Sequence, residues 1–438
     1  MGTALVGYEL NNARTVRAWC MYDWANSVYS LVITSAIFPI YYKSVAVTAN
    51  GDLVQFMGFT IENSVLYTYS LSFSFLVVAI LLPLLSGVAD YAGMKKTFMK
   101  FFVMVGSLAC MGLFFFKDIN DLEWGIFCSI MASIGYSGSL VFYDAFLPEI
   151  VTIDRYDSTS ARGYSMGYYG SVILMVISLV LITYYSAFGF TSEGDAVRFT
   201  FLLVGVWWIG FSMITFKYVP ENPYGREPTG NIWIKGYAEL IKVWKSLSSS
   251  SDLKKYLAAF FFFNMGVQTV MYLATLFGTD VLHLDSTKLI MTILVIQLVA
   301  SVGAWLSARF SAAYGNKLAL MVMIGIWIIV CVGAYFTATE FQFYALAFVV
   351  GMIMGGVQSL ARATYTKLIP ETEIDHASYF SFFDVTYNIS IVMGTFSFGL
   401  INQLTGSMRN SALALAVFFI VGMLLLTLVK SKKLQQAS

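Results

Sequence analysis

Charged residues and histidines are scarce in this sequence. Only 12% of its 438 residues are charged and two are histidine, whereas an ordinary soluble protein carries about 25% charged residues. Hydrophobic residues make up 58% of the chain, and the mean hydropathy is +0.73. These values exclude an ordinary soluble fold and predict an integral membrane protein.

Other missing features exclude several kinds of chemistry. The 26 basic and 25 acidic residues nearly balance, so no overall field would attract nucleic acid. The four cysteines stand singly in apolar sequence, without the paired spacing of a metal or redox site. The histidines lie near expected loops beside no nucleophile, and no glycine-rich phosphate loop ending in lysine occurs. We therefore expect no enzyme, no catalytic or metal-binding residues and no cofactor.

Apolar stretches recur along the whole chain, each long enough to cross a bilayer. About 20 apolar residues span the hydrocarbon core. The pattern predicts an all-α polytopic membrane protein with twelve transmembrane helices. These helices are expected near residues 17–41, 66–89, 97–116, 123–147, 164–187, 197–217, 255–281, 288–308, 317–337, 341–367, 378–402 and 409–430.

Lysine and arginine set the expected orientation of these helices. Basic residues remain mainly on the cytoplasmic side of a membrane. Only five of them fall in the loops of one side, so both termini are expected in the cytoplasm. If the chain is bacterial, the membrane is the plasma (inner) membrane. The five residues are Lys43, Lys117, Arg198, Lys288 and Arg409.

An internal repeat divides the chain. Gly93-Met94-Lys95 and Gly315-Asn316-Lys317 follow the second and eighth spans, and lie 222 positions apart. Leu147-Pro148-Glu149 and Ile369-Pro370-Glu371 end the fourth and tenth spans at the same offset. Two landmarks with one offset predict two homologous six-helix halves. The expected domains are residues 1–217, a cytoplasmic linker 218–254, and residues 255–438.

The linker has two parts of different character. Pro220, Pro223 and Pro228 exclude a regular helix in its first part. The following stretch, residues 232–247, places apolar side chains at helical spacing, with lysines and a glutamate elsewhere on the helix. A helix lying on the membrane surface fits this pattern. A linker helix that packs beneath the bundle fits it as well.

The loop SGVADYAGMKK, residues 86–96, resembles the signature between the second and third helices of the major facilitator superfamily. Asp90, Gly93 and Lys95 match that pattern, as does the next lysine, whereas Ser86 and Tyr91 depart from it. In that superfamily these residues clamp the two halves together on the cytoplasmic side. The resemblance implies the major facilitator fold and a cytoplasmic gate, in which we include Asp90, Gly93, Lys95, Glu149, Arg162 and Arg362.

Three further motifs resemble the fungal vacuole effluxer family and its bacterial relatives, a branch of that superfamily. They are YDWANS at residues 22–27 followed by Ile37-Phe38-Pro39, DAFLPE at 144–149, and GGVQSLAR at 355–362. The resemblance implies a solute transporter. The fungal members are associated with efflux of amino acids from the vacuole, and the substrates of the bacterial members are less settled.

Polar residues concentrate on particular spans. Asp23, Ser27, Ser30 and Thr34 recur at intervals of four, three and four, so they share one face of the first helix. The fourth, seventh, tenth and eleventh spans also carry polar side chains, whereas the third, sixth, ninth and twelfth have almost none. We expect the first and fourth helices of each half to line a central cavity, and the third and sixth to face lipid.

An ionised group at mid-membrane costs about 2.5–3.5 kcal/mol on insertion scales, so it persists where water, a partner or a ligand meets it. Asp23, Asp144 and Asp384 are therefore coupling candidates. Alternatively, they latch helices together, and Asp23 could pair with Arg162 or Arg362. Candidate solute-binding residues, which could instead join helices by hydrogen bonds, are Tyr22, Asn26, Ser30, Tyr143, Asn264, Gln268, Gln358 and Asn388.

These patterns predict a secondary transporter that works by alternating access. It would move a small organic solute, amino acid or peptide-like, with protons as the coupling ion. Sodium coupling, facilitated diffusion, and a receptor or scaffold that transports nothing remain alternatives. The expected partners are the solute, protons and the lipid bilayer, with no nucleic acid, and the chain is expected to be a monomer.

Overall fold

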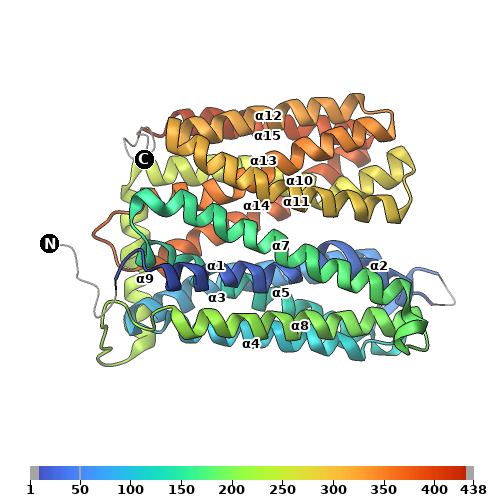
Figure 1. Ribbon diagram of the computed structural model, residues 1–438, viewed down its shortest axis with the longest axis horizontal. Coiled ribbons are helices and arrows are strands. Elements are labelled where there is room, and N and C mark those ends of the chain that lie inside the picture. Colours follow the sequence, from blue (N-terminus) through green and yellow to red (C-terminus); the bar gives the residue numbers. More distant parts are fainter. Residues whose placement is uncertain (1–8, 49–50, 431–438) are drawn as a thin grey trace.

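The computed structural model describes residues 9–48 and 51–430, and they form an almost entirely helical protein (Figure 1). The expected all-α membrane fold is confirmed. The one regular non-helical element in these ranges is a short antiparallel hairpin, β1 (Leu53–Phe56) with β2 (Phe59–Glu62), in the first loop. Its turn contains Gly58 at φ +86°, a value that glycine adopts without strain.

The N-terminal half runs from α1 to α8. The first span consists of α1, a π-helical segment and α2, and α6 is a single short turn. The bounds are α1 (Ala13–Val28), the π segment (Tyr29–Ala36), α2 (Ile37–Val45), α3 (Asn63–Ala92), α4 (Lys95–Gly112), α5 (Leu122–Ala145), α6 (Leu147–Ile150), α7 (Tyr156–Thr183) and α8 (Glu193–Tyr218).

The C-terminal half contains six long helices and follows the linker helix. The bounds are α9 (Ile232–Ser249) for the linker helix, then α10 (Ser251–Leu282), α11 (Ser286–Tyr314), α12 (Asn316–Phe336), α13 (Glu340–Leu368), α14 (His376–Thr405) and α15 (Met408–Thr427).

The twelve expected spans correspond to twelve long helical segments of the described chain. Ten of them are apolar enough to qualify as membrane spans by composition alone. The other two, α10 and α14, have 32 and 30 residues, so they are also long enough to cross. They carry polar side chains such as Asn264, Gln268, Asp384 and Asn388, which lower their apolar content.

The π segment interrupts the first span at its middle. Ser35 donates its hydroxyl to the carbonyl of Ser30, five residues earlier, at 2.9 Å. Pro39 follows the segment and has no backbone N–H to continue the ordinary helical ladder. The wider winding places Ser30 and Ser35 on the side of the helix that faces the space between the halves.

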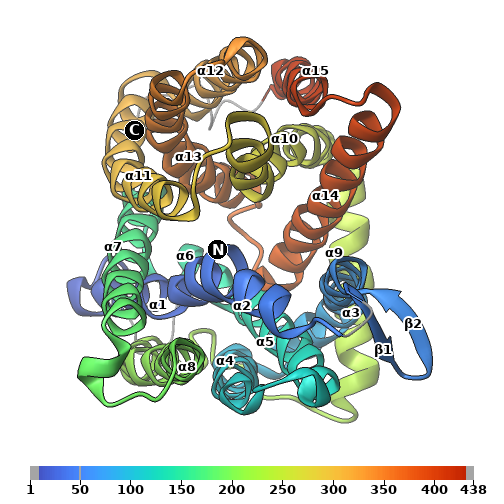
Figure 2. The ribbon, with the colours of Figure 1, turned by 90° about the vertical axis from the view of Figure 1, so that its right-hand side faces the viewer.

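The two halves lie side by side, with α4 and α8 at one edge of the molecule and α12 and α15 at the opposite edge (Figure 2). Within the N-terminal half, glycines let α7 approach α1 closely. A Cβ at Gly170 would lie 2.6 Å from the carbonyl oxygen of Trp24, and one at Gly167 would lie 3.1 Å from that of Asp23. Side chains at these positions would therefore force the helices apart.

Helix α1 begins and α15 ends at the same end of the bundle as α9 (Figure 1). We call this the linker end. Helix α9 packs against α3, and its buried side chains include Leu240, Val243 and Leu247. Trp233 and Trp244, beside the buried face of the helix, remain more than half exposed. The linker helix therefore packs one face on the bundle and keeps aromatic side chains at the border of that face available to a membrane surface.

Candidate functional site

A cavity of about 190 Å³ lies between the halves. Both the first span and α5 contribute from the N-terminal half, and α10 and α13 from the C-terminal half, as the sequence pattern predicts. Helices α3, α7, α11 and α14 also contribute. Within the described ranges, no residue of α4, α8, α12 or α15 lines it. Those helices carry long apolar side chains on their outer faces, such as Phe101, Val206, Ile329 and Leu424.

Six of the eight candidate solute-binding residues line this cavity. Tyr22 and Tyr143 do not, because both side chains are fully buried in the N-terminal half. The ring centre of Tyr143 lies 4.4 Å from that of Trp19, on which it stacks, and 4.8 Å from that of Tyr22. These rings therefore pack behind the residues that line the cavity. The six that line the cavity are Asn26, Ser30, Asn264, Gln268, Gln358 and Asn388.

Arg362 of α13 joins the two halves at the linker end of the cavity. Its Nη1 donates to Asp144 Oδ1 at 2.8 Å, and its Nη2 lies 3.5 Å from Asp23 Oδ2. Its Nε donates to Ser160 Oγ at 2.9 Å. The hydroxyl of Tyr143 donates to Asp23 at 2.7 Å. One guanidinium thus holds two carboxylates of the other half, while itself being only 2% exposed.

Aromatic rings of the N-terminal half enclose the same guanidinium. The Arg362 Cζ lies 4.4 Å from the ring centre of Tyr164, 4.8 Å from Trp19 and 5.4 Å from Tyr143. Ring faces attract a cation, and more strongly where water is excluded. Gly163 makes the approach possible, because a Cβ there would lie 3.2 Å from Arg362 Nη2. The hydrogen bonds, ion pairs and ring contacts of the Arg362 guanidinium described here are thus all with the opposite half.

Asp384 is the third carboxylate of the cavity, and its setting differs. Asn388, one turn further along α14, donates its Nδ2 to Asp384 Oδ2 at 2.7 Å. No lysine, arginine or histidine nitrogen of the described chain lies within 4 Å of this carboxylate. Asp384 is therefore not part of the group that Arg362 holds together.

Neutral hydrogen bonds continue the contact between the halves beside Arg362. Ser160 of α7 donates to the carbonyl of Ser359 at 2.8 Å. Tyr168 donates its hydroxyl to Gln358 at 2.8 Å, and Ser165 to the carbonyl of Ser301 at 3.0 Å. These side chains fix α7 against α13 and α11 and close the space between the halves toward the linker end.

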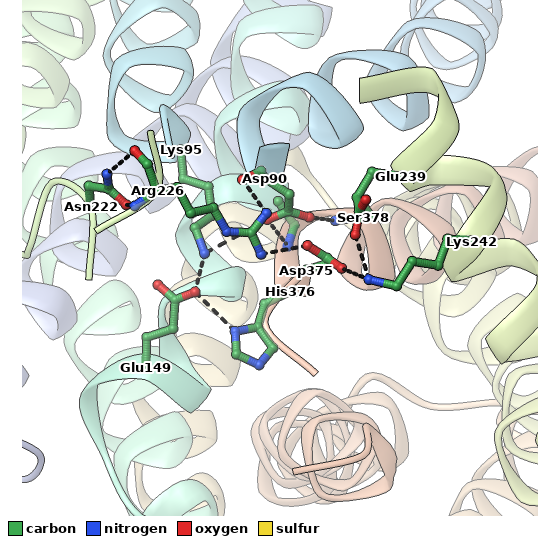
Figure 3. Close-up of polar contacts among 11 residues, drawn as sticks. Asp90, Lys95, Glu149, Asn222, Arg226, Glu239, Lys242, Asp375, His376 and Ser378 are labelled. Atoms are coloured by element: carbon green, nitrogen blue, oxygen red, sulfur yellow. Dashed lines mark hydrogen bonds and ion pairs between the residues drawn. The ribbon is translucent and has the colours of Figure 1, made fainter. Parts of the chain in front are cut away.

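A buried polar network lies beyond them at the linker end (Figure 3). Lys95 pairs with Glu149, and Glu149 Oε1 also lies 2.9 Å from His376 Nδ1 of the other half. The carboxylate of Asp90 accepts the backbone N–H of Ser378 at 2.7 Å, and Lys95 lies 3.8 Å from it. The structure therefore brings the expected gate residues Asp90, Lys95 and Glu149 together.

The linker extends this network (Figure 3). Arg226 pairs with Asp375 Oδ1 at 2.5 Å and also donates to the backbone carbonyl of Asp90. Lys242 of α9 pairs with Asp375 Oδ2 at 3.1 Å. Burial opposes the ionisation of Asp375. The hydrogen bond with Glu239 and the charge of Arg226 outweigh burial, so the pKa of Asp375 falls to about 2.

A second buried cluster at the linker end was not predicted from the sequence. Lys367 of α13 pairs with Asp157 of α7 at 2.7 Å and donates to Asn316 Oδ1 at 2.7 Å. Asn316 and Ser311 in turn donate to Asp157, at 2.8 and 2.9 Å. Both charged side chains are nearly inaccessible, so each needs the other. This cluster joins α7 to α11, α12 and α13.

Two expected gate residues have different roles from the rest. Gly93 ends α3 at φ +66°, and a Cβ there would lie 2.6 Å from the Asn222 side chain, so it contributes shape rather than charge. Arg162 is exposed on α7 and forms no ion pair within the described ranges. Of the two arginines weighed as partners for Asp23, the structure selects Arg362.

The family model described as "Vacuole effluxer Atg22 like" matches residues 11–438. An uncharacterized MFS-type transporter of Bacillus subtilis (strain 168), YxiO, is 34% identical over 414 residues, which cover 94% of each chain. Autophagy-related protein 22 of Yarrowia lipolytica is 23% identical, over 84% of this chain and 76% of that protein.

Solved structures of major facilitator superfamily transporters have the same fold. The proton:xylose symporter XylE superposes with a TM-score of 0.73 and 12% identity, over 95% of this chain and 96% of that chain. The transporter FucP in its outward conformation superposes with a TM-score of 0.70 and 10% identity, over 96% of this chain and 98% of that chain. At these identities the similarity establishes the fold alone.

Proposed function

Because this chain belongs to the vacuole effluxer Atg22-like family of the major facilitator superfamily, we propose that it is a secondary active transporter that works by alternating access. Residues 1–217 and 255–438 would be the two bodies that rock about the central cavity. The solute would bind among the amide, hydroxyl and carboxylate side chains that line the cavity from both halves.

The polar contacts at the linker end support an outward-facing state. Each hydrogen bond and ion pair described above between the halves lies between that end and the middle of the helices. The basic residues of the sequence favour the linker end as the cytoplasmic side, and hence cytoplasmic termini. In a bacterial cell the membrane would be the plasma membrane.

Protons are the coupling ion that the Arg362 site favours. Arg362 enters a pocket of the N-terminal half, and the linker end cannot open until it leaves. Its departure would leave Asp23 and Asp144 charged and buried, at a cost of about 3–5 kcal/mol for a broken buried pair. A proton on either carboxylate reduces that cost. Asp144 is 16% exposed at its side chain, so the cavity can deliver the proton.

An amino acid or a peptide-like molecule fits the proposed solute. Its amide, ammonium and carboxylate groups match the mixture of Asn, Gln, Ser and Asp side chains in the cavity wall. The single observation that carries the proposed function is the pairing of Arg362 with two carboxylates of the opposite half. The pairing links a titratable site in the cavity to closure of the linker end.

Proteoliposomes with a trapped pH dye and radiolabelled solutes test this function, because they report proton movement and solute flux separately. Amino acids and dipeptides are added one at a time, and we expect at least one to move protons across the membrane with it. Asp144→Asn should abolish the proton movement, and Asp154→Asn, a change at an exposed side chain, should not. Solute flux without proton movement would favour facilitated diffusion. If that flux required sodium, it would favour sodium coupling. No flux of any solute would favour a receptor or scaffold.

A further inference from the structure

Asp384 stands apart from the other carboxylates of the cavity. Asp23 and Asp144 both face the guanidinium of Arg362, at 3.5 and 2.8 Å. In the part of the chain that the structure describes, Asp384 has no such cation, and its ion-pairing capacity is unused. A buried carboxylate without a cation is costly unless a ligand or a proton supplies the positive charge.

The hydrogen bonds of Asn388 show whether a ligand or a proton suits the site better. Its Nδ2 donates both to Asp384 Oδ2 at 2.7 Å and to the Asp384 carbonyl at 2.9 Å. The nitrogen must face these oxygens, because an amide oxygen would meet only other acceptors there. The Oδ1 of Asn388 is left without a hydrogen-bond partner, although the residue is only 1% exposed. An orphaned buried acceptor costs about 1–3 kcal/mol.

A proton on Asp384 would satisfy only part of this arrangement. It would neutralise the carboxylate and leave Asn388 Oδ1 unpaired. An ammonium group carries a positive charge and several N–H donors, so it can reach Asp384 and Asn388 Oδ1 together. Both residues line the cavity, so a solute bound there lies beside them.

Aromatic rings beside these residues make this part of the cavity wall suited to an organic solute. Phe260 of α10 and Phe383, the neighbour of Asp384 in sequence, both line the cavity, and their rings stack at 4.2 Å. Phe383 also stacks on Tyr365 at 4.8 Å, so these rings offer the cavity apolar surface for the carbon skeleton of a solute. The C-terminal wall of the cavity thus combines a carboxylate, an unused amide oxygen and aromatic surface.

We propose that Asp384 and Asn388 form the subsite for an organic ammonium group of the transported solute. The inference rests on the proposed function only in taking the central cavity as the solute site. Asp384 would bind the ammonium by charge, and Asn388 would orient the carboxylate and accept one further hydrogen bond. The solute would accordingly be a cation or a zwitterion, and a simple carboxylic acid would bind poorly.

Three probes with one phenylethyl skeleton test this subsite on the full-length protein in lipid nanodiscs. They are phenethylammonium, zwitterionic L-phenylalanine and 3-phenylpropanoate, chosen because Phe260 and Phe383 line the cavity. Calorimetric titration should show that both ammonium-bearing probes bind, and that 3-phenylpropanoate binds roughly tenfold or more weakly, as the loss of a charge-assisted hydrogen bond predicts. Equal affinities for the three probes, or no binding of any of them, would overturn the proposal.

Asp384→Asn should weaken binding of phenethylammonium roughly tenfold or more, because the amide keeps the shape and removes the charge. Asp154→Asn is the matched control and should bind as the parent does, since Asp154 is exposed at the linker end. Unchanged binding by Asp384→Asn contradicts the subsite. Neither measurement requires a gradient, so loss of binding in this variant stands even if the parent moves no protons.

A labelling experiment on the parent protein avoids dependence on a folded variant. Dicyclohexylcarbodiimide modifies carboxylic acids inside membrane proteins, and mass spectrometry reports the modification of Asp384. Phenethylammonium should slow that modification severalfold, and 3-phenylpropanoate should not. Equal rates with and without phenethylammonium would overturn the assignment of Asp384, while leaving proton coupling through Asp23 and Asp144 intact.

Discussion

The carboxylate of Asp90, in the N-terminal half, accepts the backbone N–H of Ser378 at the start of α14, in the C-terminal half. The first N–H groups of a helix have no partner within it, and a negative charge there also meets the positive end of the helix dipole. Asp375, the residue before α14, makes no side-chain cap of its own. The N-terminal half therefore caps a helix of the C-terminal half, and opening the linker end must break that cap.

Asp90→Asn should open the linker end more often, because the amide loses the charge that favours the cap. A charged hydrogen bond contributes about 1.5–3 kcal/mol, so the open fraction should rise roughly tenfold. The reporter is a cysteine in place of Ser359, which is buried between the halves, labelled with N-ethylmaleimide. Protein with only its native cysteines, all buried, gives the background. A labelling rate equal to that of Ser359→Cys alone would contradict the role of Asp90.

Arg362→Gln should destabilise the protein, because it leaves Asp23 and Asp144 buried beside one another without a cation. The loss should be about 3 kcal/mol or more, measured by unfolding of the purified protein. A second change, Asp144→Asn, should restore part of that stability by removing one of the unpaired charges. Arg309→Gln is the control, because Arg309 is exposed and stacks only on Trp305 at 3.7 Å. If both arginine changes lowered the stability equally, the pairing of Arg362 with the two buried carboxylates would not be the cause of the loss.

Asp23→Asn should leave the chain folded and reduce gradient-driven accumulation of solute sharply. The amide can still accept the hydrogen bond from Tyr143, but it cannot take up a proton. Counterflow separates coupling from binding: we expect exchange to persist while concentration against a gradient is lost. Accumulation at the parental level under a proton gradient would show that Asp23 belongs to the architecture of the first span. Loss of expression would identify it as a latch.

The contribution of the linker network to the stability of the protein should depend on pH, because Asp375 titrates. Its pKa is lowered from 3.8 to about 2, so its contribution to stability is present above about pH 4 and is lost as pH falls toward 2. One pKa unit corresponds to about 1.4 kcal/mol, so the contribution is about 2 kcal/mol. The stability difference between the parent and Asp375→Asn should be constant near neutral pH and shrink below pH 4. A difference that does not change with pH would exclude this charge effect, and Asp154→Asn provides the baseline.

Cysteines at three exposed positions test the orientation. Those placed at Asp52 and Gly406, at the end of the bundle opposite the linker, should react with an impermeant maleimide added to intact cells. One at Ser249 on α9 should react only after the membrane is permeabilised. Labelling of Ser249→Cys in intact cells would invert the proposed topology.

Local patterns in the sequence predicted the helices, the signature loop and most of the cavity wall. The helical spacing of Asp23 and Ser30 placed both on the cavity face, and Asn264 and Asn388 came from the same reasoning. That reasoning could not separate Tyr22 from its neighbours, because its burial depends on Trp208 and Tyr143 of other helices. The spacing of residues along one helix shows which of them share a face. Which other helix packs against that face depends on the tertiary structure.

Apart from Arg362, one of two partners considered for Asp23, the pairings between distant segments could not be predicted from the sequence. Asp157 and Lys367 are 210 positions apart and occur in no recognised motif, so nothing local linked them. Arg226 lies in a proline-rich stretch without periodicity, and it reaches Asp375 only because the linker folds back under α3. Asp90 was found because the superfamily signature names its position, but its use as a cap for α14 requires the other half in place.

The π segment Tyr29–Ala36 sets the phase between the two ends of the first span. An α-helix turns about 100° per residue, so one residue more or less rotates everything beyond it by roughly that angle. Before the segment, Asn26 faces the cavity; after it, the hydroxyl of Tyr41 donates to the carbonyl of Phe116 at 2.8 Å. If one residue were removed from the segment, Asn26 and Tyr41 could no longer both keep these orientations. A deletion in this span should therefore be as harmful as a change of either side chain.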